Sequence, residues 1–358
     1  MDKVPKYQEI AEWLCHNIYT GVFKPGSKLV SETNLCEKFD ISRQTARSAI
    51  AILEKDDLVI RKRGSGTYVK DFISSAGCKK VGLMFTYADD YIFPPIISGI
   101  EEVLSERGHR MSLCLTHNKV DHERANLLDL LSDNIDGLIV EPAKSALPNP
   151  NSDLYNEFTK RGIPCIFLNA YHTNLKCNYI VNNDAEGGKL AVKHLIEKGH
   201  TKIAGIFKHD DIQGHFRYSG FAKELYSKNL SVSDQNIIWY STETLPGLFS
   251  PENFKWISER LEGASAVVCY NDQIAVLLIE ACSRAGIHVP DDLSVVSFDD
   301  SNLSRITSVP LTSITHPSSE MGRLAAKSIL RIIADKESSV QHIFKPSLVI
   351  RNSVQTRL

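Results

Sequence analysis

The side chains with the clearest chemical potential lie near the N-terminus, where Arg43 and Arg47 are four positions apart and Gln44 follows Arg43. Residues at this spacing share one face of a helix. Arginine and glutamine can make paired hydrogen bonds to the edges of guanine and adenine, and Thr45 can donate its hydroxyl to a phosphate. The pattern indicates a nucleic-acid contact. The alternative is a solvated helix face whose charges serve solubility.

A second basic group lies further along the chain, at Arg61, Lys62 and Arg63, followed by a glycine-containing turn. Positive charges at the tip of a hairpin can neutralise phosphates or enter a minor groove. Two residues at the start of the first expected helix can also contact phosphates, although structural roles are equally open for them. The candidate nucleic-acid contacts are Lys6, Tyr7, Ser42, Arg43, Gln44, Thr45, Arg47, Arg61, Arg63, Gly64 and Gly66.

The elements that must position these residues follow from apolar spacing and turn residues. Residues 7–20 have apolar positions at helical spacing, and Ser31 precedes a short helix that ends near Phe39. Ser42 can cap a longer helix after a connection of only two residues, which is typical of a helix-turn-helix. Residues 58–62 and 67–70 are expected to form two strands of a hairpin, or wing, around Gly64.

The sequence pattern changes near residue 80. From there, short apolar segments expected to form strands alternate with amphipathic segments expected to form helices, as parallel sheets covered on both faces require. We expect strands at 81–85, 111–115, 137–140, 163–168, 203–207, 266–269 and 293–298, and helices at 96–107, 123–131, 185–198 and 274–285. About 280 residues exceed one comfortable sheet, so two lobes are expected. The fold class is therefore α/β, with a small α+β unit in front.

Ligands of open parallel sheets bind beyond the carboxyl ends of the strands. Polar and aromatic residues stand there: Tyr87, Asp89, Asp90, Tyr91 and Phe93 after the first strand, Glu141 and Lys144 after the third, and Asn169 after the fourth. Carboxylates and amides can bind pairs of hydroxyl groups while an aromatic face stacks on C–H bonds, so these residues suit a polyol. Surface decoration is the alternative for each of them.

Charge and composition fit this division. Residues 1–70 hold 12 lysines and arginines against 9 acidic residues, and the remainder holds 29 against 34, so a basic part precedes an acidic one. No C-x-x-C pair occurs among the 8 cysteines, which are expected to be reduced and mostly buried. The first 20 residues are too charged for a secretory signal, and no apolar run is long enough to span a membrane. We therefore expect a cytoplasmic protein.

The first seventy residues resemble GntR-type winged-helix domains. The motifs that carry the resemblance are Ser31-Glu32 through Leu35, Ile41 through Arg47, and Gly64-Ser65-Gly66-Thr67-Tyr68-Val69. The family implies a dimer on double-stranded operator DNA, with recognition helices in major grooves and wing tips in minor grooves. Arg43, Gln44, Thr45, Arg47 and Gly66 fall on family positions that touch DNA. The chain departs from the pattern at Thr33, where many members carry arginine.

From Lys80 onward the chain resembles the LacI/GalR effector domain, which is similar to periplasmic sugar-binding proteins. The resemblance rests on Tyr91 to Pro94, Asp136 to Glu141, His200 to Ala204, Arg217 to Phe221, Tyr270 to Ala275, and Val289 to Asp300. On this resemblance Arg217, Asn271 and Asp299 fall on second-lobe positions that hold the effector. The candidate effector contacts are Tyr91, Phe93, Glu141, Lys144, Asn169, Arg217, Asn271 and Asp299.

The pairing of these two parts resembles arabinose-responsive repressors, and it implies a repressor that responds to L-arabinose. We expect the protein to be a homodimer in which the sugar closes the two lobes and so releases the operator. Another pentose, a hexose or a nucleoside is the alternative effector. An enzyme is not expected, because no G-x-S-x-G elbow, P-loop or H-E-x-x-H helix occurs, and no metal or cofactor is expected either. A transport binding protein would need a signal segment.

The expected domain plan has three parts. Residues 1–70 form the winged helix-turn-helix, residues 71–79 a linker, and residues 80–358 the effector-binding and dimerisation domain. Within it, the first lobe is expected at about 80–183 and 313–337, and the second at about 184–312 and 338–358.

Overall fold

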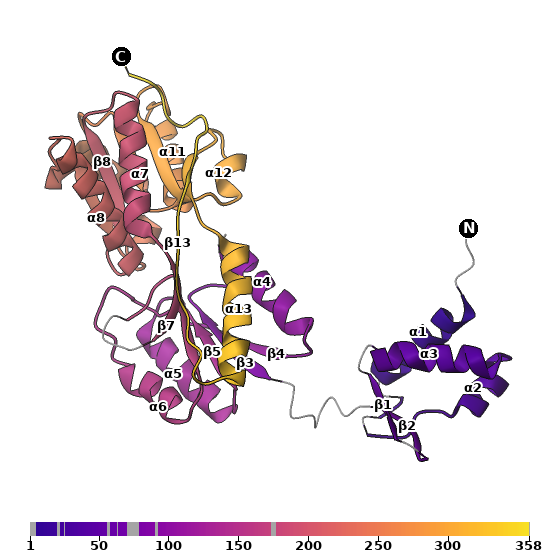
Figure 1. The fold of residues 1–358 in the computed structure, drawn as a ribbon. Coiled ribbons are helices and arrows are strands. Elements are labelled where there is room, and N and C mark those ends of the chain that lie inside the picture. Colours follow the sequence, from indigo (N-terminus) through magenta and orange to yellow (C-terminus); the bar gives the residue numbers. More distant parts are fainter. Residues whose placement is uncertain are drawn as a thin grey trace. The chain divides into compact units, whose positions relative to one another are not determined.

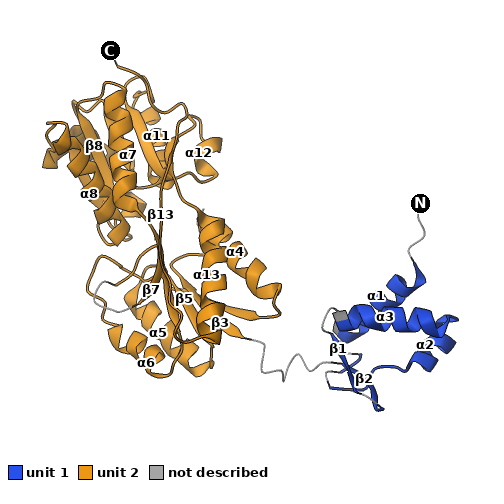
Figure 2. Ribbon diagram, viewed as in Figure 1, with its two compact units in different colours: residues 1–78 blue, residues 79–358 orange. Residues whose placement is uncertain are grey.

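The computed structural model divides the chain into two compact units, residues 1–78 and residues 79–358, which are described separately (Figures 1 and 2). The residues that the structure describes are 5–19, 22–24, 26–55, 58–62, 64–69, 79–89, 92–172 and 177–357. Most of the predicted linker lies outside these ranges. Lys79, its last residue, belongs to the second unit, where its backbone N–H donates to His109 Nδ1 at 3.0 Å.

The first unit is a small helical fold in which three helices share one apolar core. The helices are α1 (Lys6–Tyr19), α2 (Glu32–Phe39) and α3 (Arg43–Lys55). Ser31 caps α2, with its hydroxyl oxygen accepting from the Asn34 backbone N–H at 3.1 Å. Asp40 adopts a left-handed conformation, with φ of 47°, and this tight turn leads directly into α3. The core joins α1, through Ile10 and Leu14, to α3, through Ile50.

A two-stranded hairpin completes this unit. Strands β1 (Val59–Lys62) and β2 (Gly66–Val69) pair antiparallel, with Lys62 opposite Gly66. Lys28 forms a bridge with Tyr68, which ties the segment after α1 to the hairpin. The helix-turn-helix and the wing expected from the sequence are therefore both present.

The second unit consists of two lobes, each built on a six-stranded sheet (Figure 1). The sheet of the first lobe is parallel throughout and contains, in spatial order, β13 (Gln341–Phe344), β7 (Asn178–Asn182), β6 (Cys165–Leu168), β5 (Gly137–Val140), β3 (Lys80–Phe85) and β4 (Arg110–Leu115). Its helices are α4 (Phe93–Ser105), α5 (Val120–Ser132), α6 (Ser152–Lys160) and α13 (Ser318–Ala334). The central strand β5 is buried along its whole length, as a strand covered on both faces must be.

The sheet of the second lobe is parallel except at one edge. Its spatial order is β14 (Leu348–Val349), β12 (Thr312–Thr315), β11 (Ser294–Asp299), β10 (Ala266–Cys269), β8 (Ile203–Lys208) and β9 (Ile237–Tyr240), and only β14 runs antiparallel. Its helices are α7 (Asp184–Glu197), α8 (Ile212–Ser227), α9 (Leu245–Leu248), α10 (Pro251–Leu261), α11 (Asp272–Arg284) and α12 (Leu303–Ile306), with a 3-10 turn at Asp234–Asn236. The fold class predicted from the sequence is confirmed.

In the described residues the chain crosses between the lobes at three points: from β7 to α7, from β12 to α13, and from β13 to β14. Two of the predicted lobe boundaries need correction. Residues 313–315 extend β12 in the second sheet, whereas the sequence placed them in the first lobe. Residues 341–344 pair with β7 in the first sheet, whereas the sequence placed them in the second lobe. Neither strand has a pattern that tells which sheet it joins.

Several elements were absent from the sequence prediction, among them α6, α8, α10, α13 and the strands β7, β9, β12, β13 and β14. Most of the missed strands have only two to five residues, too few for a clear period. No disulfide joins the described cysteines, and only Cys269 and Cys282 are buried, so the expectation that most are buried is wrong. None of the helices in the described ranges has both the length and the apolar character needed to cross a bilayer.

Candidate functional site

Helix α3 of the first unit divides into a buried face and an exposed polar face. Ala46, Ala49, Ile50 and Leu53 are at most 1% exposed and form the core. Arg43, Gln44 and Arg47 are exposed, and Arg43 and Gln44 lie in the first turn of α3. The first turns of such a helix are the part that reaches base edges. The structure thus brings the three side chains named from the sequence onto one solvent-facing surface.

The two hydroxyl residues of this segment have a structural task. Ser42 Oγ accepts a hydrogen bond from the Thr45 backbone N–H at 3.2 Å and lies 2.9 Å from Thr45 Oγ1. This is the arrangement of an N-cap, which stabilises a helix by about 1 kcal/mol. Ser42 therefore fixes where α3 begins.

Two of the candidate arginines lie in exposed ion pairs. Arg47 Nε is 2.9 Å from Glu32 Oε2, and Arg61 Nε is 3.1 Å from Glu54 Oε1. The arginine side chains are 58% and 45% exposed, so each pair contributes little to stability. Both guanidinium groups can exchange these partners for a phosphate or a base at small cost.

The wing tip needs glycine at two positions. Gly64 and Gly66 have φ of 76° and 122°, values that L side chains rarely adopt, and a Cβ on Gly66 would lie 2.6 Å from Lys28 Cε. Arg63 lies outside the described residues. Lys6 is exposed and Tyr7 half-buried at the start of α1.

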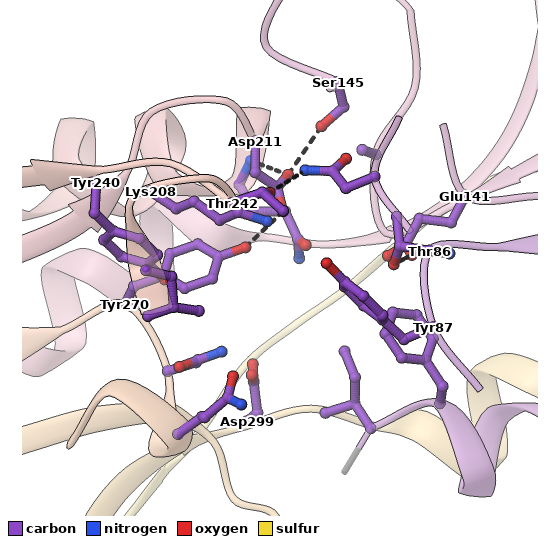
Figure 3. Close-up of a pocket in the computed structure, with 18 of the residues that line it drawn as sticks. Thr86, Tyr87, Glu141, Ser145, Lys208, Asp211, Tyr240, Thr242, Tyr270 and Asp299 are labelled. Carbon is purple, nitrogen blue, oxygen red and sulfur yellow. Dashed lines mark hydrogen bonds between the residues drawn. The ribbon is translucent and has the colours of Figure 1, made fainter. Parts of the chain in front are cut away.

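The second unit contains a cavity of about 440 Å³ between its lobes, at the carboxyl ends of the parallel strands. Figure 3 shows Thr86, Tyr87 and Glu141 of the first lobe facing Tyr240 and Tyr270 of the second across this space. The cavity occupies the position that the strand order predicts for a ligand.

Glu141 is the central carboxylate of the first-lobe wall. It is 7% exposed, and its Oε2 accepts hydrogen bonds from Thr86 Oγ1 at 2.5 Å and from the Thr86 backbone N–H at 3.3 Å. Its Oε1 accepts from Asn169 Nδ2 at 2.8 Å. Burial raises the pKa of Glu141 to about 7 in spite of these donors. The carboxylate is held in one orientation and can accept hydroxyl hydrogens from a ligand.

This raised pKa predicts a pH-dependent stability. The Glu141 carboxyl ionises near pH 4.5 in the unfolded chain and near pH 7 in the folded one. The contribution of Glu141 to the free energy of unfolding is therefore greatest below pH 4.5 and is lost as the pH rises to 7. Glutamine does not ionise, so the Glu141→Gln variant does not lose stability in this way. Between pH 5 and pH 8 we expect the unfolding free energy of the variant to rise by about 3 kcal/mol relative to wild type, measured by urea unfolding. Parallel profiles of wild type and variant would contradict the assignment, and exposed Glu102→Gln is the control.

Arg217 forms the centre of the second-lobe wall and is only 2% exposed. Its Nε donates to Asp184 Oδ1 at 2.8 Å, its Nη1 to the Tyr270 carbonyl oxygen at 2.6 Å, and its Nη2 to Asp299 Oδ1 at 3.2 Å. Burial opposes the charge, but the carboxylates of Asp184 and Asp299 hold the pKa of Arg217 well above its usual value. Because every part of the guanidinium is bonded, Arg217 fixes the geometry of this wall.

The close packing of α7 against α8 sets the place of Arg217. A Cβ on Gly188 would lie 2.1 Å from the Arg217 carbonyl oxygen, and one on Gly220 would lie 1.9 Å from the Ala185 carbonyl oxygen. Only glycine permits this approach, which brings Arg217 of α8 to Asp184, the first residue of α7.

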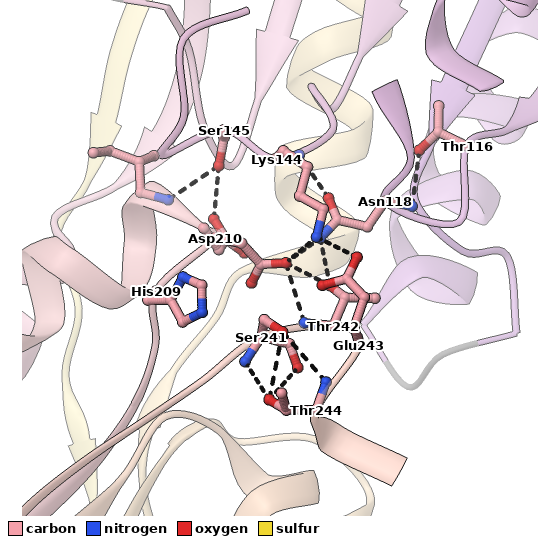
Figure 4. Close-up of polar contacts among 12 residues, drawn as sticks. Thr116, Asn118, Lys144, Ser145, His209, Asp210, Ser241, Thr242, Glu243 and Thr244 are labelled. Atoms are coloured by element: carbon pink, nitrogen blue, oxygen red, sulfur yellow. Dashed lines mark hydrogen bonds and ion pairs between the residues drawn. The ribbon is translucent and has the colours of Figure 1, made fainter. Parts of the chain in front are cut away.

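A set of hydrogen bonds and ion pairs joins the lobes beside the cavity, and we call it the interlobe latch. Lys144 Nζ is 2.8 Å from Asp210 Oδ2 and 2.6 Å from Glu243 Oε1 (Figure 4). Asn118 Nδ2 donates to Thr242 Oγ1 at 2.6 Å. The other members are Ser145 and Asp211, whose side chains bond at 2.9 Å. Lys144, Asn118 and Ser145 belong to the first lobe, so the latch holds the lobes together.

Asp211 belongs to both the latch and the cavity. Its Oδ1 accepts from Ser145 of the first lobe, and its Oδ2 accepts from the Tyr270 hydroxyl at 2.6 Å.

The neighbouring residue, Asp210, carries buried charge in the latch. Its side chain is 1% exposed, and Lys208 and Lys144 hold the pKa of Asp210 below its usual value although burial acts in the opposite direction. The latch therefore contains charge that stays buried as long as the lobes touch.

The predicted effector residues divide into three groups. Phe93, Glu141, Arg217, Asn271 and Asp299 line the cavity, as do Tyr87 and Asp89. Lys144 and Asn169 do not line it: Lys144 lies in the latch, and Asn169 lies behind Glu141. Asp90 and Tyr91 lie outside the described residues.

Other lining residues were not named as candidates from the sequence: Thr86, Asn118, Ser145, Lys208, Asp211, Gln213, Tyr240, Thr242 and Tyr270. The same rule, position at or just after a predicted strand, would have identified three of them: Thr86, Lys208 and Tyr270. Tyr240 and Thr242 follow β9, which the sequence did not predict.

The lining suits a neutral polyhydroxylated ligand. Carboxylates accept hydroxyl hydrogens, lysine and amide groups donate, and tyrosine and phenylalanine rings offer flat apolar surfaces. Among the described residues no group of histidine, cysteine, aspartate or glutamate has a metal-binding arrangement.

Comparisons with known proteins agree with this division. Residues 6–69 match the bacterial regulatory proteins of the gntR family, and residues 192–354 match the periplasmic binding protein-like domain. The crystal structure of transcription regulator CcpA of Lactococcus lactis aligns with a TM-score of 0.68 at 22% identity, over 78% of this chain and 100% of that one, which shows the fold alone. A winged helix joined to such a two-lobed unit defines a DNA-binding transcription regulator.

Two curated relatives specify the family. The arabinose metabolism transcriptional repressor of Halalkalibacterium halodurans is 38% identical over 97% of this chain and 96% of its own length. That of Geobacillus stearothermophilus is 37% identical over 98% of both. The chain belongs to the family of arabinose metabolism transcriptional repressors. It is therefore a regulator and not an enzyme, as the sequence led us to expect.

Proposed function

We propose that this protein is a homodimeric, cytoplasmic repressor that binds operator DNA through α3 and the wing and is released from it by L-arabinose. The observation that carries the proposal is the polar and aromatic cavity between the lobes of a chain that also has an exposed recognition-type helix. The names of the relatives support arabinose metabolism as the regulated process.

The walls of the cavity support a sugar as the effector. Glu141 is fixed by three hydrogen bonds, and Asp299 is held by Arg217, so both walls present oriented carboxylates. Tyr87 and Phe93 line the first-lobe side and add apolar ring surfaces. A ligand that touches both walls stabilises the arrangement in which the lobes are together.

Release of DNA then follows from a difference in affinity. If the sugar has a higher affinity for the closed protein than for the DNA-bound protein, it shifts the population away from the DNA-bound state. DNA then weakens sugar binding by the same factor. Two copies of the reader place two recognition helices at the spacing of a palindromic site.

A titration of selected DNA tests the whole proposal. Sites are selected from a random pool by the full-length chain, and their affinity is measured with and without saturating L-arabinose. We expect the sugar to weaken binding by at least about tenfold, a coupling of roughly 1.4 kcal/mol. An unchanged operator affinity would refute induction by this sugar. Calorimetry with other pentoses, hexoses and nucleosides then identifies the effector.

A pair of substitutions tests the reader. We expect Arg43→Ala to lower operator affinity by about 1–3 kcal/mol while affinity for random DNA changes little, because Arg43 faces the bases. We expect Arg61→Ala to lower both affinities alike and to flatten their dependence on salt, because a phosphate contact carries no sequence information. Equal losses on operator and random DNA for both variants would contradict base reading by Arg43.

A further inference from the structure

A chain of hydrogen bonds runs from the cavity to one of the lobe crossings. Behind Glu141, Asn169 Nδ2 donates to Glu141 Oε1 at 2.8 Å. On its other side, Asn169 Oδ1 lies 3.0 Å from His316 Nε2. His316 Nδ1 in turn lies 2.7 Å from Ser318 Oγ. His316 stands between β12 of the second lobe and α13 of the first, so it belongs to the segment that joins them.

The protonation of His316 determines the direction of this chain. Burial lowers the pKa of His316 to about 4, so the ring is neutral near pH 7. A neutral ring carries one proton, and the Asn169 carbonyl oxygen can only accept, so Nε2–H donates to it and Nδ1 accepts from the Ser318 hydroxyl. The Asn169 amide is thereby oriented with its NH₂ toward Glu141. The reverse orientation would place the carbonyl oxygen of Asn169 against the carboxylate.

Asn169 depends on this support. It is 2% exposed and has a φ of 62°, a conformation that asparagine tolerates but does not favour. Loss of the His316 donor would leave a buried acceptor unsatisfied and free the amide to rotate, which would weaken the hold on Glu141.

We propose that His316 is a positioning residue for the effector site: through Asn169 it fixes the Glu141 carboxylate and links it to the crossing between the lobes. The inference rests on the proposed function, because it assigns His316 an effect on sugar affinity that acts only through Glu141. Arg217 and Asp299 lie near enough to act on the His316 ring electrostatically, so the residue also stands beside the second-lobe wall.

A double-mutant cycle tests this link, with L-arabinose affinity of the full-length chain measured by calorimetry. We expect His316→Leu to weaken binding about tenfold and His316→Gln, which retains an N–H donor, to weaken it less than about threefold. In a Glu141→Gln background, His316→Leu should add less than about a twofold change, because the group it positions is already altered. His288→Leu, at an exposed histidine, is the matched control.

The outcomes separate the inference from the proposed function. If Glu141→Gln leaves sugar affinity unchanged, the proposed site is wrong. If Glu141→Gln weakens binding but His316→Leu does not, or weakens it equally in both backgrounds, the positioning role is wrong. A second arm needs no ligand: the same cycle in urea unfolding should give non-additive midpoints, and additive midpoints would overturn the link between His316 and Glu141 even if another sugar is the effector.

Discussion

A chain in which Lys144 is replaced by methionine is expected to bind operator DNA with undiminished affinity and to bind L-arabinose about a hundredfold more weakly, the equivalent of roughly 3 kcal/mol. The reason lies in the interlobe latch. With the lobes together, Lys144 neutralises Asp210, whose side chain is 1% exposed, and contacts Glu243. Methionine would remove the ammonium group that pairs with the buried carboxylate of Asp210, which then keeps only neutral donors from Asn118 and Thr242 in hydrogen-bond contact. This cost disappears when the lobes separate and water reaches Asp210.

The measurement is calorimetric titration of sugar together with an operator-binding assay. The expected phenotype is a repressor that sugar no longer releases. Lys160→Met, at an exposed lysine of α6, is the matched control and should behave as wild type. Asp210→Asn gives a second view, because it removes the charge that Lys144 neutralises. Sugar affinity within about twofold of wild type in Lys144→Met would show that the latch contributes nothing to closure.

The second large effect is expected at Arg217. Replacing it by methionine leaves Asp184 and Asp299 as buried carboxylates without their cation, so the unfolding free energy should fall by about 3–5 kcal/mol and sugar binding should be lost. Adding Asp184→Asn should recover part of the stability, since one of the two uncompensated charges is gone. It should not recover sugar binding, because the hydrogen bond from Arg217 to Asp299 is still missing.

Unfolding in urea and calorimetry measure the two effects separately. Arg323→Met is the contrast: Arg323 pairs with Glu102 at 3.2 Å, but both side chains are about half exposed, and the loss should stay below about 1 kcal/mol. Similar losses at Arg217 and Arg323 would contradict the view that burial makes the Arg217 cluster different.

The reader unit could be predicted almost completely, because its signals are local. The helical spacing of Ala46, Ile50 and Leu53 identified the buried face of α3, and the opposite face then held Arg43 and Gln44. The cap at Ser42 was also predicted, and its hydroxyl oxygen accepts the hydrogen bond from the Thr45 backbone N–H that defines such a cap.

The candidate site could be predicted only in part. Position after a strand correctly indicated Glu141, but Lys144 and Asn169 do not line the cavity. Both have positive φ, 48° and 62°, so their side chains do not continue the alternation of the preceding strand. One consequence is that Lys144 reaches across to the second lobe, a contact between residues 66 positions apart that no local pattern contains. The same holds for the pairing of Asn169 with His316.

The three crossings between the lobes bear on how the protein is made. The first sheet has β13 as its outer strand, and α13 packs against α4, so the first lobe needs residues 318–344 although it begins at residue 80. The second sheet likewise needs β14. During synthesis from the N-terminus, the first lobe has all of its strands only after residue 344 has been added, and the second only after residue 349. The reader segments, in contrast, precede both lobes in the chain, so a chain truncated within the second unit would carry a complete reader without a complete cavity between the lobes.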